Sequence, residues 1–276
     1  MSPRTATADS RTAGLAGAIA DRLTNPAEIA PSLTATNWWR QSLAHGAPGV
    51  ALLHIERAAL GLARWRPAHD WITYLAAPAL TTGPDSHLFY GAPALAHVLA
   101  CANAHQPQSY RHALDGLDHD IARQTRSRVD AAHARLDRSD LPALAEFDLI
   151  RGLTGLGSYL LHRDPAGTAT HAVLEYLVRL SEPISHDGEA VPGWWTLTGP
   201  AGRPSDRFDG GHANHFSGVS KEDIPRICGV FVRGRVAGVG RCCYLMVGIP
   251  RSVWVPGELR IVLSRLVSFS LALVRL

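Results

Sequence analysis

Apolar residues recur every three to four positions along most of the first two thirds of the chain. In the segment HAVLEYLVRL, for example, Val173, Leu174, Leu177 and Val178 fall on one face of a helix. Alanine and leucine are abundant and runs of β-branched residues are few, which also favours helices. The pattern predicts an all-α body with helices over residues 10–23, 47–64, 68–79, 91–104, 109–137, 150–163 and 168–182.

Three short segments repeat the same order of small and apolar residues: HGAPGVALL from residue 45, YGAPALAHV from 90 and RGLTGLGSY from 151. In each segment the second residue is glycine and the fourth is Pro or Thr. The fifth residue is small, the sixth is apolar and the seventh is small again. Proline suits the first turn of a helix, and small residues let that turn approach a neighbouring backbone. The repeat predicts turns that lead inward-facing helices, arranged as helical hairpins in a ring or solenoid. The alternative is that these are ordinary helix starts in an alanine-rich protein.

The formal net charge of +3 is unevenly distributed along the 276 residues. Residues 218–276 hold nine basic and three acidic side chains, a net charge of +6, so the first 217 residues carry −3. The basic character therefore belongs to the tail and does not indicate a nucleic-acid-binding protein. The four cysteines form no convincing disulfide framework, and neither a signal peptide nor a membrane span is evident. We expect a cytoplasmic protein.

The segments SLAHGAPGVALL, FDLIRGLTGLGSYLL and GWWTL…DGGHAN resemble, in this order, segments of the lanthionine synthetase C-like (LanC) family. The resemblance covers roughly residues 40–214, the front portion of that family's domain. It implies an α/α toroid in which Gly-rich turns lead the inner helices and the active site lies at one mouth of the ring. The expected organisation is a partial toroid over residues 1–217 followed by an atypical basic and apolar tail over 218–276.

The resemblance also implies a reaction. LanC cyclases add a cysteine thiol of a peptide to a dehydroalanine or dehydrobutyrine, which closes a lanthionine or methyllanthionine ring. A zinc ion held by two Cys and one His stabilises the thiolate, because the neutral thiol is a poor nucleophile. The implied partners are a dehydrated precursor peptide and a lanthipeptide dehydratase.

One site residue follows from the resemblance. Asp148 lies where the family has an acidic residue at the mouth, ahead of an inner helix, and the resemblance assigns it proton movement around the thiol. Gly152, Gly155 and Gly157 would let that helix crowd the ring centre and leave room for a peptide. The residues alone also allow a structural role, in which Asp148 caps the helix over 150–163 for about 0.5–2 kcal/mol.

The chain departs from the family after Asn214. The expected Ala-His-Gly pattern is absent, no histidine follows His215, and the tail cysteines include an adjacent pair that is poorly placed for one tetrahedral site. We therefore expect no zinc ligand here and a lost cyclase activity, the alternative being a non-catalytic remnant or a peptide-binding module. The tail is either a distinct module or the product of a shifted reading frame or broken gene. An open half-ring would also favour self-association.

Other sites are less favoured by the sequence. Most of the fourteen histidines, among them His54, His87 and His97, lack paired ligand spacing and are interpreted as surface or core-lining residues. The Gly/Pro-rich segment 188–211 predicts a long ordered loop with a short strand near Trp194–Leu197. The tryptophan pairs in NWW and GWW could stack on sugars, although loop-anchoring tryptophans are commoner. A glycosidase needs two nearby acids, and Asp148 has no obvious sequence partner.

Overall fold

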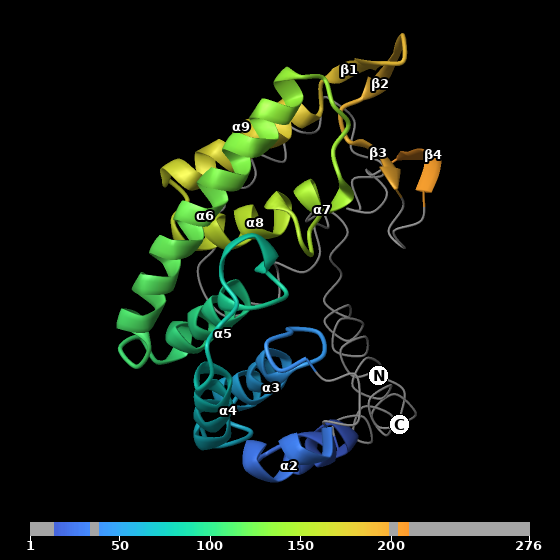
Figure 1. Cartoon of the computed structure of the whole chain (residues 1–276). Helices are drawn as coiled ribbons and strands as arrows, with labels where there is room; N and C mark the ends of the chain where they lie inside the picture. The colour runs from blue at the N-terminus through green and yellow to red at the C-terminus, as the bar shows by residue number, and fades with distance from the viewer. Residues whose placement is uncertain (1–13, 34–38, 199–203, 210–276) are drawn as a thin grey trace, which may run out of the picture.

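The computed structural model describes residues 14–33, 39–198 and 204–209, which are mostly helical (Figure 1). Residues 14–22 are helical, and the following helices are α2 (Pro26–Leu33), α3 (Ala47–Ala59), α4 (Arg66–Ala76), the 3-10 helix η1 (Gly83–Asp85), α5 (Ala92–His105), α6 (Arg111–Asp137), α7 (Leu144–Phe147), α8 (Leu153–Arg163) and α9 (Thr168–Leu180). The predicted helical body is confirmed. The short helices α2 and α7 were not predicted.

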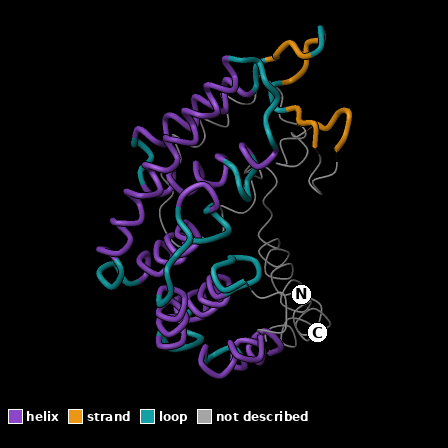
Figure 2. Tube along the Cα trace, viewed as in Figure 1, coloured by secondary structure: helices purple, strands orange, loops and turns teal. Residues whose placement is uncertain are grey.

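The long helices pack in pairs, α3 against α4, α5 against α6 and α8 against α9. In addition, α3 packs against α5, α5 against α8, and α6 against both α8 and α9. The pairs follow one another along an open arc from α2 to α9 (Figures 1 and 2). This arrangement is consistent with a partial α/α toroid.

The Gly-led repeats lie at the starts of the first helices of these pairs. Gly46, Gly91 and Gly152 are the N-cap residues of α3, α5 and α8. Gly91 has a φ of +77°, which favours glycine because a side chain would be strained there. The repeated sequence therefore marks one structural position that recurs three times in the fold.

Helix α3 ends earlier than its apolar pattern predicts. Gly61 has a φ of +70°, and its N–H donates to the carbonyl oxygen of Ala58 over 3.0 Å. The N–H of Leu62 donates to the carbonyl oxygen of Arg57 over 2.8 Å. These two bonds form a Schellman motif, which ends the helix at Ala59 rather than at residue 64.

Two small antiparallel hairpins follow α9. Strand β1 (Pro183–His186) pairs with β2 (Glu189–Pro192), and β3 (Trp195–Thr198) pairs with β4 (Pro204–Asp209). The predicted strand near Trp194–Leu197 is confirmed, but the rest of this segment is not simply a loop. The turn between β1 and β2 is formed by Asp187 and Gly188, both at positive φ, as a type I′ turn requires.

The described residues have two hydrophobic cores. The larger core lies between α3, α4 and α5 and is completed by α6 and α8; its bulkiest members are Ile55, Trp71, Leu75, Val98, Leu114, Ile121, Leu156 and Tyr159. The second core lies between α6, α7, α8 and α9 and includes Val129, Phe147, Leu153, Val173 and Tyr176. Helices α6 and α8 contribute residues to both cores. The segment that leads into α8 therefore lies where the two cores meet.

The two tryptophan pairs differ in their surroundings. Trp39 is 54% exposed, whereas Trp194 packs against the second core, as expected for a tryptophan that anchors a loop.

In the described ranges, no helix has the length and apolarity needed to cross a bilayer. The predicted tail, residues 218–276, lies outside the described residues.

Candidate functional site

The segments that precede α3, α5 and α8 lead into the first helices of the three pairs, and together we call them the rim. It comprises residues 39–46, 80–91 and 146–152. The N–H of Leu43 donates to the carbonyl oxygen of Phe89 over 2.9 Å, and the N–H of Gly91 donates to that of Gln41 over 3.3 Å. The loops before α3 and α5 are thus joined by hydrogen bonds. The head of α8 lies beside them, since a β-carbon on Gly155 would be 3.2 Å from that of Leu88.

Asp148 lies on the rim, just before α8. Its Oδ1 accepts hydrogen bonds from the backbone N–H groups of Arg151, over 2.5 Å, and of Gly152, over 3.0 Å. These contacts close the loop just before α8. They are not the helix cap that the sequence allowed, because the N-cap residue of α8 is Gly152 and no side chain caps it. No described residue donates to its Oδ2. The carboxylate is thus fixed through one oxygen and can use the other.

His87 reaches the Asp148 loop from the loop before α5. Its ring is close enough to the loop for the charges of Arg151 and Asp148 to act on it. Burial lowers the pKa of His87, and the positive charge of Arg151 lowers it further. No local pattern predicts this position of His87, because residues 87 and 148 are brought together by the packing of α5 against α8.

Arg128 reaches the same loop from α6. Its Nη2 donates to the carbonyl oxygens of Ala145, over 3.2 Å, and of Arg151, over 2.8 Å. In the sequence, Arg128 stands in a charge-rich segment that is typical of a solvated helix face. Its role was therefore missed, because no local pattern separates it from the other arginines of α6.

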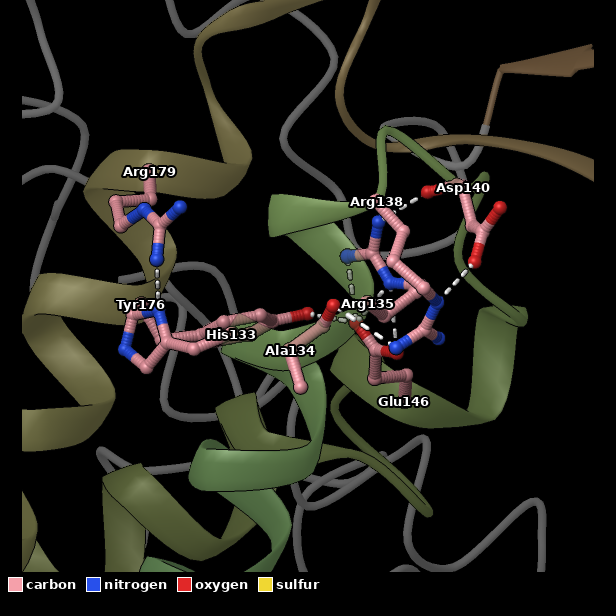
Figure 3. A network of polar contacts seen from close by, with 8 residues as sticks. All are labelled: His133, Ala134, Arg135, Arg138, Asp140, Glu146, Tyr176 and Arg179. Atoms are coloured by element: carbon pink, nitrogen blue, oxygen red, sulfur yellow. Dashed lines mark hydrogen bonds and ion pairs between the residues drawn. The ribbon is translucent and has the colours of Figure 1, made fainter.

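A network of polar side chains holds the residue two places before Asp148 (Figure 3). The guanidinium of Arg135 donates to both carboxylate oxygens of Glu146, over 2.8–3.2 Å, and the hydroxyl of Tyr176 donates to Oε1 over 2.7 Å. Burial raises the pKa of Tyr176, and the Glu146 charge raises it further. The network joins α6 and α9 to α7, so it anchors the start of the Asp148 loop.

A second network, in which a tyrosine and an arginine again hold a carboxylate, lies along α8. The hydroxyl of Tyr159 donates to Asp118 Oδ1, and Arg163 donates to Oδ2 from Nε, over 3.0 Å, and from Nη2, over 2.7 Å. Burial raises the pKa of Tyr159, and the Asp118 charge adds to this effect. Here too a carboxylate is fixed by one tyrosine and one arginine, and it fastens α6 to α8.

Comparison with known protein families decides the relationship. The family model for lanthionine synthetase C-like proteins matches residues 37–196. The chain belongs to the lanthionine synthetase C-like family. The match includes all three Gly-led repeats and Asp148. A search of curated proteins finds no match.

The described residues do not fit the zinc centre of LanC cyclases. Among them, no group of three or more His, Cys, Asp or Glu side chains is placed to hold a metal ion. Cys101 has its sulfur 3.9 Å from Nε2 of His97, but this pair supplies only two of the ligands that a Cys2His set needs. The other candidate ligands of the sequence lie outside the described residues: two histidines, His212 and His215, and the three cysteines of the tail, Cys228, Cys242 and Cys243.

The buried ring of His97 is expected to make the stability of the LanC-like domain depend on pH. Burial, with a smaller effect of the neighbouring His162, lowers the pKa of His97 to about 4. Between pH 6.5 and 4 the unfolded chain binds a proton at this ring and the folded chain does not, so stability falls as the pH falls. We expect a loss of about 2–3 kcal/mol from this residue across that range.

The measurement is urea unfolding at several pH values. In His97→Gln the slope of stability against pH should be smaller than in the parent protein, whereas His119→Gln, at an exposed position of α6, should leave it unchanged. Equal slopes in the parent protein and His97→Gln would contradict the expectation.

Proposed function

We propose that this LanC-like chain binds a dehydrated, cysteine-containing peptide at its rim and does not close thioether rings by itself. The family reaction adds a peptide thiol to a dehydrated residue and depends on a thiolate held by zinc. The sequence supplies neither the Ala-His-Gly pattern nor a histidine after His215. A dehydratase would supply the peptide, since serine and threonine must lose water before a thiol can add to them.

The observation that carries this proposal is the geometry of Asp148. One carboxylate oxygen is fixed by two backbone N–H groups at the head of α8, and the other accepts no hydrogen bond from the described residues. An oriented carboxylate with one available oxygen can accept a hydrogen bond from a thiol or an amide of a peptide. We propose that Asp148 keeps this contact, which in an intact cyclase would serve proton movement.

We also propose the boundary between the two parts of the chain. Residues 1–217 would contain the partial toroid, and residues 218–276 would not belong to the LanC-like domain. The composition supports this boundary, because alanine occurs only at 237 and 272 in the tail, where valine and arginine dominate. Reading codons 214–220 in all three frames tests it: a frame that continues with Ala-His-Gly and later Cys and Cys-His would identify the tail as a frame artefact.

The role of Asp148 is tested by binding of a fluorescent peptide that contains one cysteine and one dehydroalanine. Asp148→Asn keeps an oxygen that can accept the bonds from the N–H groups of Arg151 and Gly152 but removes the charge. We expect it to weaken binding roughly five- to tenfold, as loss of one charge-assisted hydrogen bond does. Asp130→Asn, at an exposed position of α6, removes the same charge away from the rim and should leave the affinity unchanged. Fluorescence anisotropy measures the dissociation constants.

The loss of cyclase activity is tested with the same peptide. Ring closure leaves the mass unchanged, so free thiols are trapped with iodoacetamide before mass spectrometry. We expect no thiol loss above the rate without protein, with or without added zinc. Thiol loss that depends on one tightly bound zinc would overturn the non-catalytic assignment, and absence of peptide binding would overturn the binding role.

A further inference from the structure

The loop that carries Asp148 is held at both ends by one side chain. Arg128 Nη2 donates to the carbonyl oxygen of Ala145, three residues before Asp148, and to that of Arg151, three residues after it. The two bonds, of 3.2 and 2.8 Å, cross from the outer helix α6 to the rim. A planar guanidinium is suited to this contact, because its donors are fixed relative to one another.

The same side chain brings a positive charge close to the Asp148 carboxylate. Burial lowers the pKa of Arg128, and the negative charges of Asp148 and Glu146 oppose this effect. The charge of Arg128 also acts on His87, whose pKa it lowers together with burial and Arg151. Arg128 thus influences both the backbone geometry of the loop and the electrostatics of its titratable groups.

We propose that Arg128 is the positioning residue of Asp148. The geometry assigns it two separable effects: its Nη2 group fixes the loop between Ala145 and Arg151, and its charge adds to the positive potential near His87 and Asp148. The functional meaning of this assignment rests on the proposed role of Asp148 in peptide binding. The two hydrogen bonds from Arg128 to Ala145 and Arg151, which we call the clamp, do not depend on any peptide.

Amide hydrogen exchange measured by NMR tests the clamp directly. The informative groups are the N–H groups of Arg151 and Gly152, which bond to Asp148 Oδ1 inside the loop that Arg128 spans. In Arg128→Gln we expect their exchange to accelerate about tenfold, as loss of the supporting hydrogen bonds predicts. In the same variant the imidazole pKa of His87 should rise, because one neighbouring positive charge is gone.

Arg128→Lys separates the two effects. Lysine keeps the charge, but its nitrogen lies one bond closer to the backbone than Nη2 of arginine, so it does not reach both carbonyl oxygens in the same way. We therefore expect exchange at Arg151 and Gly152 to accelerate as in Arg128→Gln, while the pKa of His87 stays close to its parent value. Arg126→Gln removes the same charge from an exposed position of α6 and should change neither quantity.

Two results would overturn the proposal. One is unchanged exchange at both amides in Arg128→Gln and Arg128→Lys. The other is equal acceleration of these amides and of those in the middle of α8, residues 156–160, which would make Arg128 a general stabilising residue. Neither measurement uses a peptide, so a failure of peptide binding at Asp148 would be seen separately from a failure of the clamp.

Discussion

Replacing Gly155 with alanine is expected to destabilise the fold by about 3 kcal/mol, although alanine is the better helix former. A β-carbon at this position would run into the carbonyl oxygen of Leu149 and would come within 3.2 Å of the β-carbon of Leu88. The first obstacle is backbone of the Asp148 loop, which cannot rotate away as a flexible side chain would. Urea unfolding followed by circular dichroism measures the change.

Gly116→Ala is the matched control. Gly116 lies inside α6, and a β-carbon there would have no atom within 4 Å. Alanine should therefore stabilise the helix by about 0.5–1 kcal/mol. The two substitutions are chemically identical and are expected to act in opposite directions. If both stabilise the protein, the close approach of the loop to α8 is not the reason for the glycine at 155.

The glycines of RGLTGLG show how far the sequence could predict the site. Their small size correctly predicted close backbone approach at the head of a helix. The family resemblance predicts that these glycines let the helix crowd the ring centre and leave room for a peptide. The atoms nearest to them belong instead to the loop before α8 and to a neighbouring helix. A β-carbon on Gly152 would meet the backbone of Asp148, and one on Gly157 would lie 2.6 Å from Cγ1 of Val173 in α9. The missing side chains of these glycines therefore leave space for the loop before α8 and for helix α9.

Elements that depend on local sequence were predicted well, and those that depend on distant contacts were not. The starts of α3, α5 and α8 follow from the repeated glycines, and the end of α3 follows from Gly61 only once its positive φ is known. The β1–β2 hairpin was missed although Asp187-Gly188 is a strong local turn signal. The contacts of His87 and Arg128 had no such signal, because they arise where separate helices pack together.

The second large loss of stability is expected on replacing Glu146. Glu146→Leu should destabilise the fold by about 3–5 kcal/mol, because it leaves the Arg135 guanidinium without its carboxylate in a largely buried position. The side chain of Arg135 is only 9% exposed and that of Glu146 20%. The hydroxyl of Tyr176 loses its acceptor at the same time. Urea unfolding at pH 7 measures the loss.

A double variant tests the cause of this loss. If the cost comes from an uncompensated buried charge, Arg135→Met in the Glu146→Leu background should restore much of the stability, since apolar side chains can replace a buried ion pair. Asp70→Asn breaks the ion pair of Asp70 with Arg66, whose side chain is 80% exposed, and should cost less than about 1 kcal/mol. A Glu146→Leu cost no larger than that of Asp70→Asn would mean that solvent reaches Arg135, and the loop before Asp148 would then need another anchor.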